Sequence, residues 1–140
     1  MVALREMKIP LLFRSAEDGT YSTDISEKYL DHYEIQSGGT QNNYVEYPVS
    51  LDAGTWAIHL YTRRGPNRCI ITFAIDGSSV GTIDLYNGSY DTASVLRSLT
   101  GVAIASAGNH LLRLTAATKN ASSSSYYMVV TGLRLIRTGS

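Results

Sequence analysis

Four side chains in two polar segments have the chemistry of a binding surface. Tyr86 and Tyr90 flank the turn residues Asn87-Gly88, Asp91 follows directly, and Tyr126 comes after a run of serines. A tyrosine ring offers apolar area with a hydroxyl at its tip, which suits sugar faces and protein interfaces alike. We therefore expect Tyr86, Tyr90, Asp91 and Tyr126 to form a ligand-binding surface for a glycan. The alternative is that the rings are ordinary tyrosines of strand edges.

Catalytic chemistry is not expected. His32, His59 and His110 belong to no nucleophile or metalloprotease motif. The single cysteine, Cys69, lies in an apolar run, which predicts a buried and unreactive thiol and excludes an internal disulfide. The sequence thus predicts a protein that is not an enzyme and requires no cofactor.

The sequence leaves calcium binding undecided. Asp18, Asp24 and Glu34 lie in segments without clear periodicity, and carboxylates are ligands that calcium prefers. Their spacing matches no known calcium loop, so the simpler interpretation is a solvated acidic surface. We assign no metal ligand.

A further polar segment is basic. Arg63, Arg64 and Arg68 surround Gly65-Pro66, a strong turn signal. We interpret this segment as a solvated loop rather than an anion site. Twelve basic residues balance twelve acidic ones over the chain, so nothing in the charge favours a nucleic-acid partner. No apolar run is long enough for membrane insertion.

Strands must position these residues. An Ala-Gly turn at residues 53–54 leads into Trp56–Tyr61, and a second one at residues 107–108 leads into His110–Thr115. Both segments alternate in polarity as half-buried strands do, and Asp76-Gly77 between them is a hairpin signal. We expect an all-β fold, a jelly-roll β-sandwich of about eight or nine antiparallel strands with an N-terminal arm.

Individual strands can be placed within this pattern. Trp56 shares a face with Ile58 and Leu60 and is expected in the core. We predict a strand over 95–104 with a kink near Gly101, and a single closing strand over 127–136. For residues 25–35 a short helix and a strand remain open.

The first 20 residues differ from the rest. We divide the chain into an N-terminal arm or edge segment, 1–20, and a single β-sandwich domain, 21–140. The apolar stretch Ile9, Pro10, Leu11, Leu12 and Phe13 is expected to contact a neighbouring subunit, with an edge strand as the alternative.

Charge is sorted along the sequence. Residues 1–50 carry four basic and eight acidic side chains, whereas residues 92–140 carry five basic and none acidic. The first interpretation is that N- and C-terminal strands lie side by side and neutralise each other. The second is head-to-tail contact between subunits.

From residue 44 onward the order of segments resembles the galactose-binding-like jelly rolls, above all carbohydrate-binding modules of families 6 and 35. The segments that carry the resemblance are NYVEYPVSLDAGTWAIHL, FAIDGSSVGTIDL, ASAGNHLLRL and YYMVVTGLRLIR. The resemblance implies a sugar site built from loop aromatics and a polar residue near the last strand. Here the loop before the second Ala-Gly strand offers Tyr90 and Asp91 but no tryptophan, and residues 128–133 contain no Asn or Asp.

Two functions follow as expectations. The first is a virion structural protein of a bacteriophage, a jelly roll that decorates or stabilises a capsid or tail surface. Its partners would be itself, as a homo-oligomer such as a trimer, and other virion proteins, with host-glycan adhesion as an addition. The alternative is a carbohydrate-binding module that binds polysaccharide through loop tyrosines. Because no signal peptide is recognisable, synthesis in the host cytoplasm and residence in the virion are expected.

Overall fold

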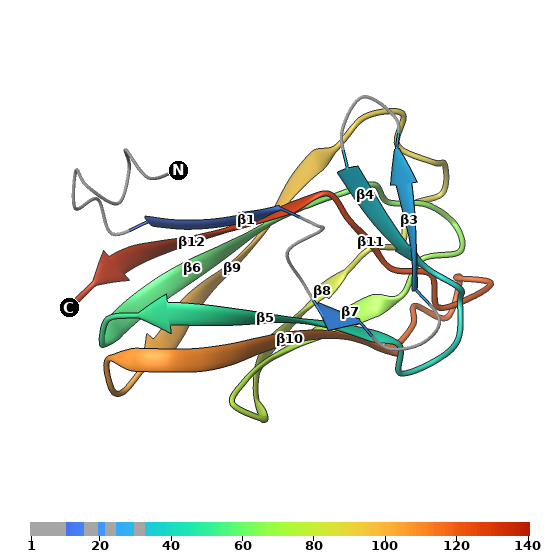
Figure 1. The fold of residues 1–140 in the computed structure, drawn as a ribbon. Coiled ribbons are helices and arrows are strands. Elements are labelled where there is room, and N and C mark those ends of the chain that lie inside the picture. The colour runs from blue at the N-terminus through green and yellow to red at the C-terminus, as the bar shows by residue number, and fades with distance from the viewer. Residues whose placement is uncertain (1–10, 16–19, 22–24, 30–32) are drawn as a thin grey trace.

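The computed structural model describes the backbone of residues 11–15, 20–21, 25–29 and 33–140 and the side chains from residue 38 onward (Figure 1). This part of the chain is built from strands. They are β1 (Leu11–Ser15), β2 (Thr20–Tyr21), β3 (Ile25–Tyr29), β4 (Tyr33–Ser37), β5 (Tyr44–Leu51), β6 (Gly54–Thr62), β7 (Ile70–Ile75), β8 (Ser78–Asp84), β9 (Val95–Ile104), β10 (Gly108–Thr118), β11 (Val129–Val130) and β12 (Gly132–Gly139). Among these residues no helix is long and apolar enough to cross a membrane.

Two antiparallel sheets face each other and enclose the core (Figure 1). One has the strand order β1-β12-β6-β9, which we call the first sheet, and the other has the order β2-β5-β10-β7-β8, which we call the second sheet. A small sheet, β11-β4-β3, lies at one end of the sandwich. The predicted all-β jelly-roll sandwich is confirmed.

The core follows from the alternation in the sequence. Trp56, Ile58 and Leu60 point inward from β6, and Trp56 is only 4% exposed. Leu112 and Leu114 do the same from β10 in the facing sheet. Cys69 is fully buried, so its predicted place in the core is confirmed, and burial raises the pKa of its thiol to about 12, which disfavours the reactive thiolate.

Two turn predictions are also confirmed. Asp76 and Gly77 both have positive φ angles, 50° and 87°, as the tight turn of a β-hairpin requires. The kink near Gly101 is a β-bulge, because the pairing of β9 with β6 shifts register between Trp56 and Ile58 and Gly101 has a φ of 71°.

The closing strand was predicted wrongly as one element. Residues 129–130 form β11, which pairs with β4 in the small sheet, whereas β12 starts at Gly132 and pairs with β6 and β1. The chain changes sheets at Thr131, whose N–H donates to the Tyr61 carbonyl at 2.8 Å. Residues 128–130 are all buried, so burial does not alternate through this segment as it would in a single strand with one buried face.

The N-terminal segments are strands where the structure describes them. Within the range 25–35, left open between helix and strand, residues 25–29 form β3 and residues 33–35 belong to β4, its antiparallel partner. β1 pairs along its whole length with β12 at the edge of the described first sheet, so chain-terminal segments do lie side by side. Ile9 and Pro10 lie outside the described residues. A subunit contact made by residues 9–13 stays a prediction, as do the domain division at residue 20 and the charge neutralisation.

Candidate functional site

Three loops meet at one end of the sandwich, and we call this surface the loop end. They are residues 63–69 after β6, residues 85–94 after β8 and residues 119–128 after β10. Main-chain hydrogen bonds join the first loop to both others: Asn87 N–H donates to the Gly65 carbonyl at 3.1 Å, and Tyr127 N–H donates to the Asn67 carbonyl at 3.1 Å. The first loop is therefore the central support of this surface.

Tyr90 is the exposed aromatic side chain of the loop end. Its exposed fraction is 55%, and Arg68 Cζ lies 5.3 Å from its ring centroid. The ring also lies over Gly65, where a Cβ atom would approach Tyr90 Cε1 to 2.8 Å. Tyr90 is thus an aromatic surface that rests on main chain and on an arginine and is open to solvent.

Asp91 fixes the loop that carries Tyr90. Its Oδ2 accepts hydrogen bonds from Arg64 N–H at 2.8 Å and from Arg64 Nε at 2.9 Å, and its Oδ1 accepts from Arg64 Nη2 at 3.3 Å. The Arg64 hydrogen bond lowers the pKa of Asp91, and Asp91 in turn raises the pKa of Arg64. With both oxygens engaged, Asp91 acts on the position of the loop. Direct contact of Asp91 with a ligand stays a prediction.

The basic loop is not the solvated segment that the sequence suggested. Arg68 is only 7% exposed, and its Nε donates to the Arg63 carbonyl at 2.9 Å. Arg63 in turn donates from Nε and Nη2 to the Asp91 carbonyl, each at 3.3 Å. These arginines organise the loop end, and sequence reasoning missed them because Asp91 is distant along the chain.

The other two predicted tyrosines are placed differently. Tyr86 lies beside Gly65 in an isolated bridge, and its N–H donates to Asp84 Oδ1 at 2.8 Å. Tyr126 is partly buried against the core, with Lys119 Nζ 5.9 Å from its ring centroid. One loop therefore carries Tyr86, Tyr90 and Asp91, whereas Tyr126 belongs to another.

A calcium ion does not fit the carboxylates of the loop end as they stand. Asp91 is engaged by Arg64, and Asp84 accepts from Tyr86 N–H and from Asn120 Nδ2 at 2.9 Å. Within the described part of the chain, no group of three or more His, Cys, Asp or Glu residues is arranged to hold a metal ion. The side chains of residues 18, 24 and 34 lie outside the described part.

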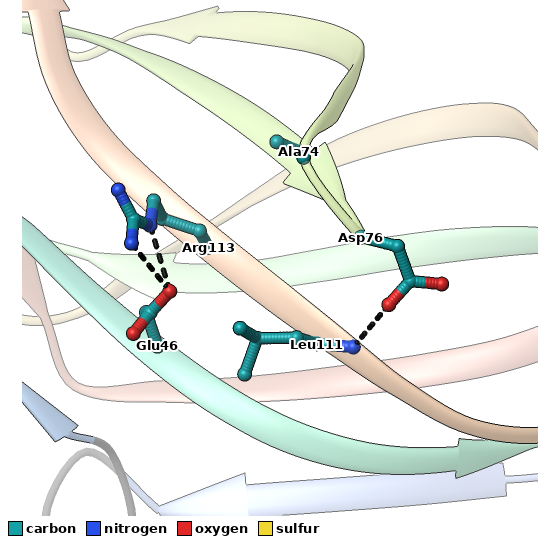
Figure 2. A pocket seen from close by; sticks show the side chains of 6 residues that line it. Glu46, Ala74, Asp76, Leu111 and Arg113 are labelled. Atoms are coloured by element: carbon teal, nitrogen blue, oxygen red, sulfur yellow. Dashed lines mark hydrogen bonds and ion pairs between the residues drawn. The ribbon is translucent and has the colours of Figure 1, made fainter.

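A pocket lies on the second sheet, beside the turn between β7 and β8 (Figure 2). It has a volume of about 340 Å³ and is lined by Glu46, Ala74, Asp76, Gly77, Leu111 and Arg113. Arg113 Nη2 pairs with Glu46 Oε2 at 2.7 Å, and Arg113 Cζ stacks 4.0 Å from the Tyr44 ring centroid. Sequence reasoning missed this pocket because its residues are outward positions of ordinary alternating strands together with two residues of a hairpin turn.

Solved structures of carbohydrate-binding modules share this fold. The first is a family 36 module of a multidomain xylanase from the hindgut metagenome of Trinervitermes trinervoides, 17% identical with a TM-score of 0.74, covering 93% of this chain and 99% of that one. The second is a family 36 module in complex with calcium and xylotriose, 14% identical with a TM-score of 0.68, covering 92% and 99%. The third is a family 6 module of Cellvibrio mixtus lichenase 5A in complex with cellotriose, 18% identical with a TM-score of 0.69, covering 91% and 97%.

No protein-family model and no curated protein sequence matches the chain. At these identities the likeness establishes the jelly-roll fold of carbohydrate-binding modules, as the sequence resemblance implied.

Proposed function

We propose that this chain is a non-catalytic carbohydrate-binding module whose glycan site is the loop end. The observation that carries the proposal is Tyr90, a 55% exposed ring held against main chain and Arg68. An aromatic ring that needs no reordering loses little conformational freedom on binding, so more of its contact free energy remains as affinity. The likeness in fold to modules solved with xylotriose and cellotriose supports a saccharide as the ligand.

The rest of the loop end suits a polyhydroxyl ligand. Ser89 is exposed beside Tyr90, and Arg63 and Asn87 are partly exposed. Such groups can donate to or accept from sugar hydroxyls at the rim of the ring. We propose that the ring supplies the apolar contact and that this rim supplies orientation.

The test is a titration of the purified chain with soluble oligosaccharides, chosen by a glycan-array screen. Tyr90→Ala should lower the affinity for a selected glycan by about tenfold or more, which corresponds to about 1.4 kcal/mol. The matched control is Leu111→Ala, which removes another exposed apolar side chain, 40% exposed, from the pocket of the second sheet. If only the Leu111 variant loses affinity, the site is that pocket and the loop end is excluded.

A virion structural role through oligomeric contacts is a second proposal. Leu96, 46% exposed, lies on β9 at one edge of the described first sheet, and β1 is at the other edge. An exposed apolar side chain on an edge strand suits contact with a second copy. Sedimentation of the purified chain tests it: an oligomer that Leu96→Ser dissociates supports this role, and a monomer at all concentrations removes it.

A further inference from the structure

His110 joins two turns that are far apart in the sequence. Its Nδ1 lies 2.6 Å from Asp76 Oδ2, and its Nε2 lies 2.8 Å from the main-chain carbonyl oxygen of Ser106. Asp76 belongs to the turn between β7 and β8, and Ser106 belongs to the turn between β9 and β10. The turn between β9 and β10 is remote from the loop end. The first residue of β9 pairs with Thr62, beside the loop end, whereas its last residue, which leads into the turn, pairs with Gly54 at the other end of β6.

Both partners of the ring can only accept hydrogen bonds. An ionised carboxylate and a main-chain carbonyl have no proton to give, and a neutral imidazole carries a single N–H. Both contacts are therefore hydrogen bonds only when His110 carries two ring protons and is a cation. In agreement, the pKa of His110 is raised, first by the Asp76 hydrogen bond and then by the Ser106 carbonyl.

The two contacts of the ring are not equivalent. Asp76 is held on β10 independently of His110, since its Oδ1 accepts from Leu111 N–H at 2.8 Å and its own N–H donates to the Leu111 carbonyl at 2.9 Å (Figure 2). When the ring loses a proton, the remaining N–H stays with the carboxylate, because hydrogen bonds to charged groups are the stronger ones. The lone pair of Nε2 then faces the lone pairs of the Ser106 oxygen.

We propose that His110 is a proton-controlled latch for the turn between β9 and β10. The protonated ring ties this turn to the hairpin of Asp76, and the neutral ring releases the turn while the hairpin stays bound to β10. Among the described residues, Asp76 is the one charged group that acts on the ring. Glu46 and Arg113, at the far side of the adjacent pocket, pair with each other.

The direction of the pH effect follows from linkage. Since the folded-state pKa of His110 lies above its ordinary value of 6.5, the contribution of the latch to stability is complete below that value. The contribution is lost as pH rises through the folded-state pKa. Because the latch is remote from Tyr90, its success or failure is independent of the glycan proposal.

The experiment is a pH titration of the full isotope-labelled chain followed by nuclear magnetic resonance. We expect both His110 ring nitrogens to be protonated at low pH and Nε2 to lose its proton first, with a midpoint above the ordinary histidine value. The carbonyl carbon signal of Ser106 should shift with the same midpoint, whereas the Leu111 amide should keep its protection from exchange. A His110 midpoint at or below the ordinary value, or a Ser106 signal that ignores the titration, would overturn the latch.

Asp76→Asn separates the latch from a merely structural contact. Asparagine tolerates the positive φ of this position, 50°, and can still accept from Leu111 N–H. Its amide can donate to the neutral ring at Nδ1, so the single ring proton moves to Nε2 and keeps the bond to Ser106 at high pH. The pH dependence of the Ser106 signal should therefore disappear, and its persistence would contradict the proposal. If this variant does not fold, the titration of the native chain decides alone.

Discussion

Tyr90 rests on Gly65 because a chain neighbour of each residue bonds to a chain neighbour of the other. Asp91 directly follows Tyr90, and Arg64 directly precedes Gly65. Asp91 N–H donates to the Arg64 carbonyl at 3.0 Å, and the two side chains form an ion pair at 2.9 Å. These bonds set the distance between the two loops, and the lack of a side chain at Gly65 lets the ring fill that distance. The orientation of the one strongly exposed ring in the described part of the chain thus depends on neighbours that a ligand need not touch.

Gly65→Ala should weaken glycan binding although the added methyl group would contact the Tyr90 ring and not the ligand. The added Cβ would overlap the Tyr90 ring, which would have to leave its support. Affinity should fall about as far as in Tyr90→Ala, as measured by titration calorimetry. Gly88→Ala is the matched control in the neighbouring loop, since a Cβ there meets nothing within 4 Å. Equal losses in both variants would mean that the fixed ring is not the cause.

Asp91→Asn should loosen the loop end and lower stability. The variant removes the charge that pairs with Arg64, and hydrogen bonds to charged groups contribute about 1.5–3 kcal/mol. In the native protein the folded-state pKa of Asp91 is lowered, chiefly by Arg64, so its contribution is present above the ordinary value of 3.8 and is lost as pH falls through the folded-state pKa. Urea denaturation of both proteins at neutral and acidic pH checks this. The stability difference should shrink in acid, and a constant difference would contradict it.

Glycan binding should not depend on calcium. The carboxylates Asp84 and Asp91 already accept hydrogen bonds at the loop end, so an ion would have to displace Arg64 or Asn120. Titration of the selected glycan after treatment with a chelator should give the same affinity as titration in excess calcium. A large loss after chelation would place a metal in the site and would point to ligands outside the described residues.

Trp56→Ala should destabilise the fold by about 3–5 kcal/mol, the usual cost of removing a large buried aromatic side chain. The ring is 4% exposed, and its Nε1 donates to the Asp52 carbonyl at 3.0 Å. Denaturation followed by circular dichroism measures the loss. Unchanged stability together with lost glycan binding would show that Trp56, and not Tyr90, contacts the ligand.

The pKa of His59 should be shifted in the opposite direction to the pKa of His110. Partial burial and then the neighbouring Arg134, whose Nη2 lies 2.9 Å from His59 Nδ1, lower the pKa of His59. Protonation of His59 therefore favours the unfolded chain, and stability is lost as pH falls from the ordinary value of 6.5 through the folded-state pKa. In one titration the His59 signals should change at lower pH than those of His110. The reverse order would contradict the contacts described for both histidines.

The alternation of polarity determined the sheet faces, as the outcomes for particular residues demonstrate. Trp56 and Leu60 are in the core, and Asp76-Gly77 makes a hairpin, because a strand buries every second residue and a tight turn needs positive φ. The same local rule failed before Thr131, where residues 128–130 are all buried and the chain moves from one sheet to another.

By itself the sequence determined the fold class, the core positions and the loop that carries Tyr86, Tyr90 and Asp91. Only the tertiary structure decided which of these rings is exposed, which arginine engages Asp91 and which two turns His110 joins. The physical reason is the separation along the chain over which these interactions act. Periodicity and turn chemistry act between neighbours along the chain, whereas ion pairs, ring supports and a shared imidazole depend on loops that come together only when the two sheets pack.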